Sequence, residues 1–435
     1  MALAATAGFA QKQWTLQDCL DYAMANSITL KKQQLQKASA TEDLKGAKAA
    51  LLPTFSGSTN QSVGYRPWQD VGGLTVTNGT VNSKVDKTYY NGSYTLSGRW
   101  TVWNGGKNVN TIRLDKIAEQ QAELSVEETA NTIQEQIARL YIQILYQTEQ
   151  LKVNELTAET ARKNEQRGEE MLRVGKMSKA DVAQLTAQRA TDEYNIVAAS
   201  SQLATYKLQL KQLLEITDEE PFEVAVPDYS DEEVLAEVPQ LQTVYEQALL
   251  TRPEMERLKL AVKSSDLNVK IAKAGWLPSL SMTAGVGTST NSLGNNKWGT
   301  QIKTNFDTQL GLSVTVPIYD GRVTKTAVNK AKLQQQTAML NLQDQEKQLY
   351  ATIQTYWLDT QNNQEKYKAA SASVTSEEES YSLLSEQFSL GLKNIVELMT
   401  GKDKLLSAQQ SRLQSKYQAI YNRQMLRFYE KGIIK

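Results

Sequence analysis

The fold is decided by a stretch that begins Trp103-Asn104-Gly105-Gly106-Lys107 and ends Arg173-Val174-Gly175-Lys176-Met177-Ser178. Between these two glycine-containing segments there is no proline. Apolar residues inside the stretch recur at spacings of four, three and four, the pattern of a coiled-coil seam, at Ile133, Ile137, Leu140 and Ile144. At 1.5 Å rise per residue, the predicted helix is on the order of 100 Å long. A helix of this length is much longer than a compact globular domain requires.

The chain contains this stretch twice. The second copy begins Tyr319-Asp320-Gly321-Arg322 and ends Ser389-Leu390-Gly391-Leu392-Lys393-Asn394, and an offset of 216 carries each turn glycine onto its counterpart. The same offset carries the seam onto Leu349, Ile353, Tyr356 and Thr360. Upstream, an offset of 225 carries Ala47-Lys48-Ala49-Ala50-Leu51-Leu52-Pro53 onto Ala272-Lys273-Ala274-Gly275-Trp276-Leu277-Pro278. We therefore predict a tandem duplication over the whole chain.

After each of those prolines the hydrophobic period changes to two, which indicates β-strands. Four strands in two hairpins are expected, with apolar side chains on one face that could meet lipid: Tyr94, Leu96, Trp100, Leu280, Met282, Leu310, Leu312, Val314 and Val316. Strands of about ten residues can cross a bilayer when tilted. Four strands cannot close a barrel, for which about eight are needed. Because lipid does not tolerate unpaired strand edges, a membrane location requires an oligomer, and three copies give twelve strands.

Composition excludes several classes of function. The formal net charge is zero, with 48 basic and 48 acidic residues, so nothing general favours nucleic acid. The absence of histidine removes His-based catalytic triads and His-metal sites. We find no catalytic constellation and expect no enzyme activity, cofactor or metal. Cys19 is the only cysteine and is expected to be a semi-buried helix residue rather than a lipid attachment site.

The chain divides by pattern into four parts. Residues 1–10 look like the end of an export signal, so the mature chain would begin at Gln11, outside the cytoplasm. The first repeat (11–216) would hold a β-hairpin (53–103) and a long helical hairpin (104–216). Residues 217–240 have nine acidic and no basic side chains and are either a solvated linker or part of a belt around the helices. The second repeat (241–435) would hold a β-hairpin (278–318) and a helical hairpin (322–430).

These residues together resemble the TolC-like outer-membrane efflux proteins. The resemblance rests on the two Leu-Pro endings, on Ala248-Leu249-Leu250-Thr251-Arg252-Pro253-Glu254, on the aromatic-x-Gly starts at 103 and 319, and on the glycine turns. It implies a mixed α and β fold in which a homotrimer forms one twelve-stranded barrel in the outer membrane of a Gram-negative bacterium. The helices would form a long periplasmic tube that meets a periplasmic adaptor (membrane fusion protein) and an inner-membrane pump. The implied function is a passive exit duct for efflux or type I secretion.

The two glycine turns are the candidate functional site. Gly175 and Gly391 suit the left-handed conformation that ends a helix, and Ser178 and Asn394 suit the start of the next one. Asp181 and Glu397 follow these caps by three residues, so two ordinary capping boxes are a sufficient explanation. The resemblance adds a closed aperture at the tube end, latched by Asp181 with Lys393 beside the aromatic Phe388, and an acidic ring at Glu397. Thr400 departs from the family's second acidic position.

A different class of function also fits the patterns. A periplasmic coiled-coil scaffold or tether, with small capping sheets and no channel, would have the same rods. It would need Leu310, Leu312, Val314 and Val316 to be covered by protein, whereas the duct needs them to face lipid. The strand faces therefore distinguish the two hypotheses.

Overall fold

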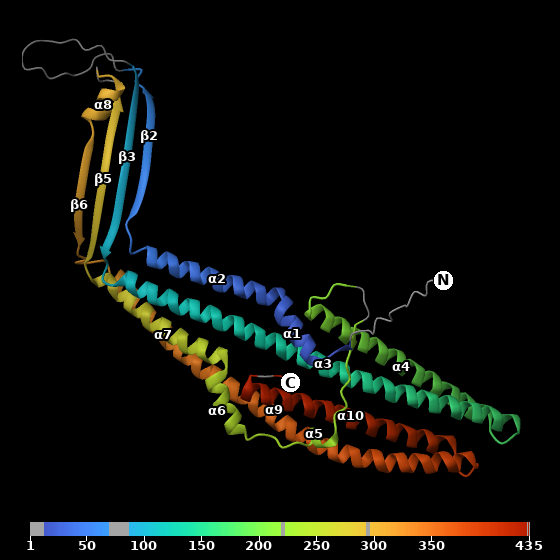
Figure 1. Ribbon diagram of the computed structural model, residues 1–435. Coiled ribbons are helices and arrows are strands. Elements are labelled where there is room, and N and C mark those ends of the chain that lie inside the picture. The colour runs from blue at the N-terminus through green and yellow to red at the C-terminus, as the bar shows by residue number, and fades with distance from the viewer. Residues whose placement is uncertain (1–12, 69–86, 219–221, 293–295, 433, 435) are drawn as a thin grey trace, which may run out of the picture. The chain divides into compact units, whose positions relative to one another are not determined.

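The computed structural model describes residues 13–68, 87–218, 222–292, 296–432 and 434 (Figure 1). The expected export signal at 1–10 lies outside the described residues. The chain forms two compact units, one of Met1–Lys37, Ala122–Lys259 and Asn341–Lys435, the other of Ala38–Gln121 and Leu260–Leu340. We call them the helical unit and the sheet unit. Each draws on both sequence repeats, whose boundaries remain a prediction.

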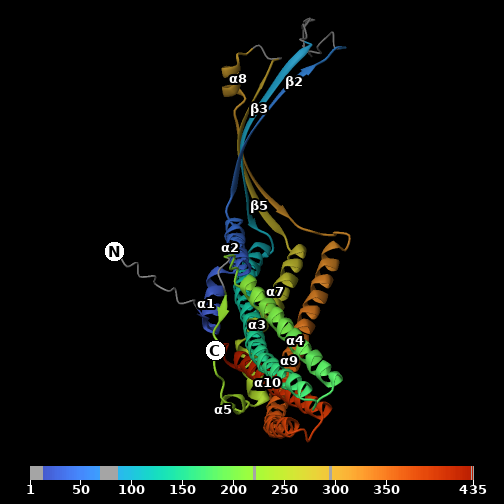
Figure 2. The same cartoon turned by 90° about the vertical axis from the view of Figure 1, so that its right-hand side faces the viewer.

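The sheet unit contains four antiparallel strands in the order β2-β3-β5-β6. They are β2 (Thr54–Tyr65), β3 (Thr88–Trp103), β5 (Ser279–Asn291) and β6 (Asp307–Thr315). The two hairpins expected from the sequence are therefore present, and they join through β3 and β5. Figure 2, turned by 90° from Figure 1, shows the twist of these strands, which has its origin in the chirality of the residues.

The sheet has one apolar and one polar face. Trp100 lies opposite Met282, which lies opposite Leu312, so the three side chains form one row across β3, β5 and β6. The neighbouring residues in each strand, such as Arg99, Thr283 and Gly311, form the row that points the other way. The alternation predicted from the sequence is confirmed within the strands, and it makes the sheet amphipathic. Val316, predicted as a further strand position of the apolar face, lies beyond β6, which ends at Thr315.

Glycine fixes the turn at the base of the sheet. Gly105 has φ +67°, and a Cβ there would lie 2.8 Å from Leu277 Cβ and 2.9 Å from the carbonyl oxygen of Ala274. The aromatic-x-Gly segment of the first repeat thus packs against the Ala-Gly-Trp-Leu-Pro segment of the second. That second segment follows α7 (Pro253–Lys273) as the short helix η1 (Ala274–Trp276). Only glycine fits this close approach.

Two helices of 67 residues each, α3 (Lys107–Arg173) and α9 (Val323–Ser389), run through both units. Each continues after its glycine turn into a shorter antiparallel helix, α4 (Lys179–Leu213) and α10 (Ile395–Lys431). The predicted seam is confirmed in the helical unit. Leu140 and Tyr356 are half-buried at the edge of the core, and the other seam residues are buried. The fully buried ones include Ile137, Ile144, Ile353 and Thr360.

The remaining elements are all shorter than α4. They are α1 (Leu16–Asn26), α2 (Ile28–Ala49), α6 (Leu241–Thr251), β1 (Gln13–Trp14), β4 (Glu223–Val224), α5 (Asp231–Val234) and α8 (Trp298–Thr304). Cys19 lies in α1, as expected, but it is fully buried rather than half-buried.

The acidic segment contributes described residues between 222 and 240 to the packing of the helical unit. Its strand β4 pairs in parallel with β1, and Phe222, Val224 and Val234 are buried in the main core of the helical unit. The sequence did not predict this small sheet, because a two-residue strand has no period to recognise.

Among the described helices, none is both long enough and apolar enough to cross a membrane.

Candidate functional site at the helical turns

Both glycine turns have the same backbone geometry. Gly175 (φ +73°) donates its N–H to the carbonyl of Leu172, and Lys176 donates to Met171. Gly391 (φ +75°) donates to Phe388, and Leu392 donates to Gln387. These bonds are those of the Schellman motif, in which a left-handed residue lets the chain reverse and satisfies the last carbonyls of the helix. The predicted roles of the two glycines as helix ends agree with this geometry.

Each following helix begins with a capping box. In the first, the Asp181 N–H donates to Ser178 Oγ at 3.1 Å, and Asp181 Oδ2 accepts from the Ser178 hydroxyl at 2.8 Å. In the second, the Glu397 N–H donates to Asn394 Oδ1 at 2.9 Å, and Glu397 Oε2 accepts from the Asn394 N–H at 3.2 Å. A carboxylate in the first turn also interacts favourably with the helix dipole. Capping is therefore one established role of both acids.

Lys393 has its ion-pair partner on its own turn. Its Nζ lies 2.6 Å from Glu397 Oε1, and both side chains are about two-fifths exposed. The hydrogen bond from Lys393, followed by the one from the Asn394 backbone, holds the pKa of Glu397 below its ordinary value. Among the residues that the structure describes, no ion pair joins Lys393 to Asp181 within the chain. A latch between those two residues would have to form between chains.

An apolar cluster holds the two turns together. Leu185 of α4 packs with Phe388, Ile395 and Leu398, and half-buried Met177, Tyr381 and Met399 surround them. Phe388 is only 3% exposed. The structure thus places this aromatic in the core between the hairpins, so that any contribution of Phe388 to an aperture is through packing.

A buried ion pair joins the hairpins near this cluster. Lys402 Nζ of α10 lies 2.6 Å from Asp192 Oδ2 of α4, and the side chains are 7% and 2% exposed. Gln188 donates to the other carboxylate oxygen at 3.1 Å. Sequence reasoning missed this pair. A signal was available, because Asp192 lies one heptad from Leu185 and another from Ala199, all on the buried stripe of α4.

The outer surface of the turns exposes apolar side chains among charged and polar ones. Four aliphatic side chains there are between 61% and 70% exposed: Val174, Leu390, Leu392 and Val396. Thr400 is also exposed, and its hydroxyl donates to the Val396 carbonyl at 2.7 Å. Exposed apolar side chains that gather at one end of a molecule are typical of an interaction surface. Within the described residues, no group of three or more acidic or cysteine side chains could hold a metal ion.

Comparison with known proteins identifies the family. The model for the outer membrane efflux protein family matches residues 19–215 and 244–429. The two matched segments lie within the two predicted repeats and leave out the whole acidic segment between them.

Two curated relatives match over nearly the whole chain. The outer membrane efflux protein BepC of Brucella suis biovar 1 (strain 1330) is 22% identical over 408 residues, which is 93% of this chain and 83% of BepC. The outer membrane protein TolC of Escherichia coli (strain K12) is 22% identical over 416 residues, 92% of this chain and 78% of TolC.

Solved structures show the same fold. A CusC structure superposes with a TM-score of 0.81 at 16% identity and covers 99% of this chain and 95% of CusC. The Campylobacter jejuni CmeC outer membrane channel superposes with a TM-score of 0.78 at 20% identity and covers 96% of this chain and 85% of CmeC. The mixed α and β fold expected from the sequence is confirmed.

Proposed function

This chain belongs to the outer membrane efflux protein family, and we propose that three copies of it form one duct, each contributing its four strands to a shared barrel. The chain is an outer-membrane exit duct with a long periplasmic helical part, and its family and fold are those of channel proteins. The trimer, its adaptor and pump partners, and passive conduction without catalysis are parts of the proposal.

The proposal rests on the exposed apolar face and the unpaired edges of the described sheet. Leu310, Leu312 and Val314 on β6 are between 62% and 75% exposed, so the described part of the chain leaves the apolar face uncovered. The outer strands β2 and β6 each pair on one side only among the described strands. An apolar face suits lipid, and in lipid both edges require partner strands. Copies of the same chain would supply those partners and leave the polar face toward the lumen.

The scaffold alternative makes a different prediction about the apolar face of the sheet. A scaffold would be soluble once exported, whereas the duct should require detergent and migrate as a trimer. Extraction of the membrane fraction with and without detergent, followed by mass measurement in detergent, distinguishes them. A monomer that stays in solution without detergent would rule out the duct.

The aperture latch is part of the proposal as a contact between chains. Lys393 would exchange Glu397 for Asp181 of a neighbouring copy when the turns converge, which leaves Glu397 free to form an acidic ring that favours cations. Each such exposed pair contributes at most about 1 kcal/mol, so three act together. The apolar side chains at the turns would contact the adaptor.

Single-channel conductance in a planar bilayer tests the latch. Replacing Asp181→Asn together with Lys393→Ala keeps the caps at Ser178 and Asn394 but removes the attraction. We expect higher conductance with unchanged trimer stability. Unchanged conductance with a less stable protein would leave Asp181 with its capping role alone. Glu397→Gln should lower the preference for cations over anions.

A further inference from the structure

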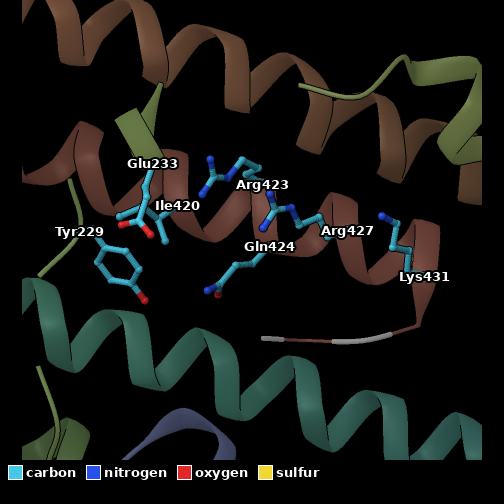
Figure 3. A pocket seen from close by; sticks show the side chains of 7 residues that line it. All are labelled: Tyr229, Glu233, Ile420, Arg423, Gln424, Arg427 and Lys431. Atoms are coloured by element: carbon cyan, nitrogen blue, oxygen red, sulfur yellow. The ribbon is translucent and has the colours of Figure 1, made fainter. Parts of the chain in front are cut away.

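A cavity of about 530 Å³ lies in the helical unit, between the segment around α5 and the C-terminal part of α10 (Figure 3). It is separate from the helical turns and from the sheet. Its lining combines an apolar wall with a row of cations, made of Tyr229, Glu233, Ile420, Arg423, Gln424, Arg427 and Lys431.

The charges of this lining do not balance. Arg423, Arg427 and Lys431 follow one another at spacings of four along α10, so they lie on one side of the helix. Glu233 is the one acid in the lining, and one of its oxygens already accepts the Ser230 N–H at 3.1 Å in the capping box of α5. The cavity therefore has an excess of positive charge.

Arg423 is the central member of the row. The residue is 7% exposed, and its Nε and Nη1 are buried without a hydrogen-bond acceptor among the described residues. Burial lowers the pKa of Arg423, and the like charge of Arg427 lowers it further. A guanidinium still keeps its proton at neutral pH. A buried cation with unpaired donors is unfavourable, and a bound ion is one of the ordinary explanations for it.

We propose that this cavity binds a small organic anion, a carboxylate or a phosphate monoester. The charged group accepts hydrogen bonds from Arg423 and is attracted by Arg427 and Lys431. Arginine suits this role because its donors match carboxylate and phosphate oxygens. The body of the ligand packs on Tyr229 and Ile420. The cavity volume lies in the range of small-molecule sites, roughly 300–1,000 Å³, and exceeds what one inorganic ion fills.

Isothermal titration calorimetry on the detergent-solubilised full chain tests the proposal with two probes at constant ionic strength. Phenyl phosphate carries both charge and an apolar body, and inorganic phosphate carries the charge alone. We expect saturable binding of phenyl phosphate, weaker binding of phosphate, and a loss of at least about tenfold in affinity for Arg423→Gln. Arg427→Gln, at an exposed position, should weaken binding without any effect on folding.

The matched control is Lys404→Gln, which removes the same charge from an exposed position of α10 outside the cavity. It should leave the affinity unchanged, and thermal unfolding of every variant checks that it is folded. No saturable binding of either probe, or the same loss in Lys404→Gln as in Arg423→Gln, would overturn the site. Equal affinity for phosphate and phenyl phosphate would overturn its assignment to an organic anion.

Discussion

Removal of Lys402 should loosen the two hairpins from each other. Lys402→Met would leave the Asp192 carboxylate, 2% exposed, with only the Gln188 amide of its present partners. Loss of one partner from a buried ion pair typically costs about 3–5 kcal/mol. At 1.4 kcal/mol for each factor of ten, backbone amides of α4 and α10 near the pair should exchange hydrogen roughly 100- to 4,000-fold faster.

Hydrogen exchange followed by mass spectrometry of peptides from these two helices gives the measurement. The matched control is Lys163→Met, because the Lys163–Glu159 pair has side chains 71% and 57% exposed. Its loss should change the exchange rates by no more than about twofold. Adding Asp192→Asn to Lys402→Met removes the buried charge and should restore most of the protection. If Lys402→Met and Lys163→Met behave alike, the ion pair does not hold the hairpins together.

Three further changes test the packing and the caps. Leu145→Ala, at a fully buried site of α3, should destabilise the helical unit by about 2–5 kcal/mol, whereas Leu156→Ala, at a 65% exposed site, should cost less than about 0.5 kcal/mol in denaturant unfolding. Gly105→Ala should lower the thermal unfolding midpoint, because an alanine there would have a strained positive φ and would contact Leu277 and Ala274. Gly46→Ala, in open space on α2, should raise the midpoint slightly. The same shift for both variants would contradict the tight turn at Gly105. Because the pKa of Glu397 is held below its ordinary 4.5, its stabilisation is present above that pH and is lost as pH falls through the lowered pKa. Glu397→Gln should therefore lose less thermal stability than the unchanged protein between neutral pH and about pH 3, and equal losses would show that the Lys393 pair contributes nothing.

The sequence predicted those parts of the molecule that depend on local pattern. Three local features each specify an element through residues that are close in the sequence. They are the period of four and three around Ile137, the period of two around Leu312, and the glycines at 175 and 391. The partner of Lys393 was also within reach, since Glu397 lies four residues later, in the first turn of the helix that begins directly after Asn394. On a helix this spacing brings side chains together. Among the described residues, Asp181, which the resemblance suggested, hydrogen-bonds only with its cap residue Ser178.

Contacts between distant segments could not be predicted in the same way. Asp192 and Lys402 are 210 positions apart, and nothing in either local pattern specifies the other residue as its partner. The unpaired guanidinium of Arg423 depends on how α5 packs against α10, which no period encodes. The sequence predicted only the two strands of the hairpin over 278–318, and not the helix α8 (Trp298–Thr304) between them.

The pairing of β3 with β5 has a consequence for the ancestry of the chain. A protein with one repeat per molecule would have to form this pairing between two molecules, at a rate set by their concentration. Joining the repeats makes the event intramolecular, with an effective concentration typically in the millimolar range. It also frees the two copies to diverge: under the offset of 216, Asp192 corresponds to Ala408 and Lys402 to Thr186. The bond between Asp192 and Lys402 therefore has no counterpart between Thr186 and Ala408, so the two copies have diverged at these positions.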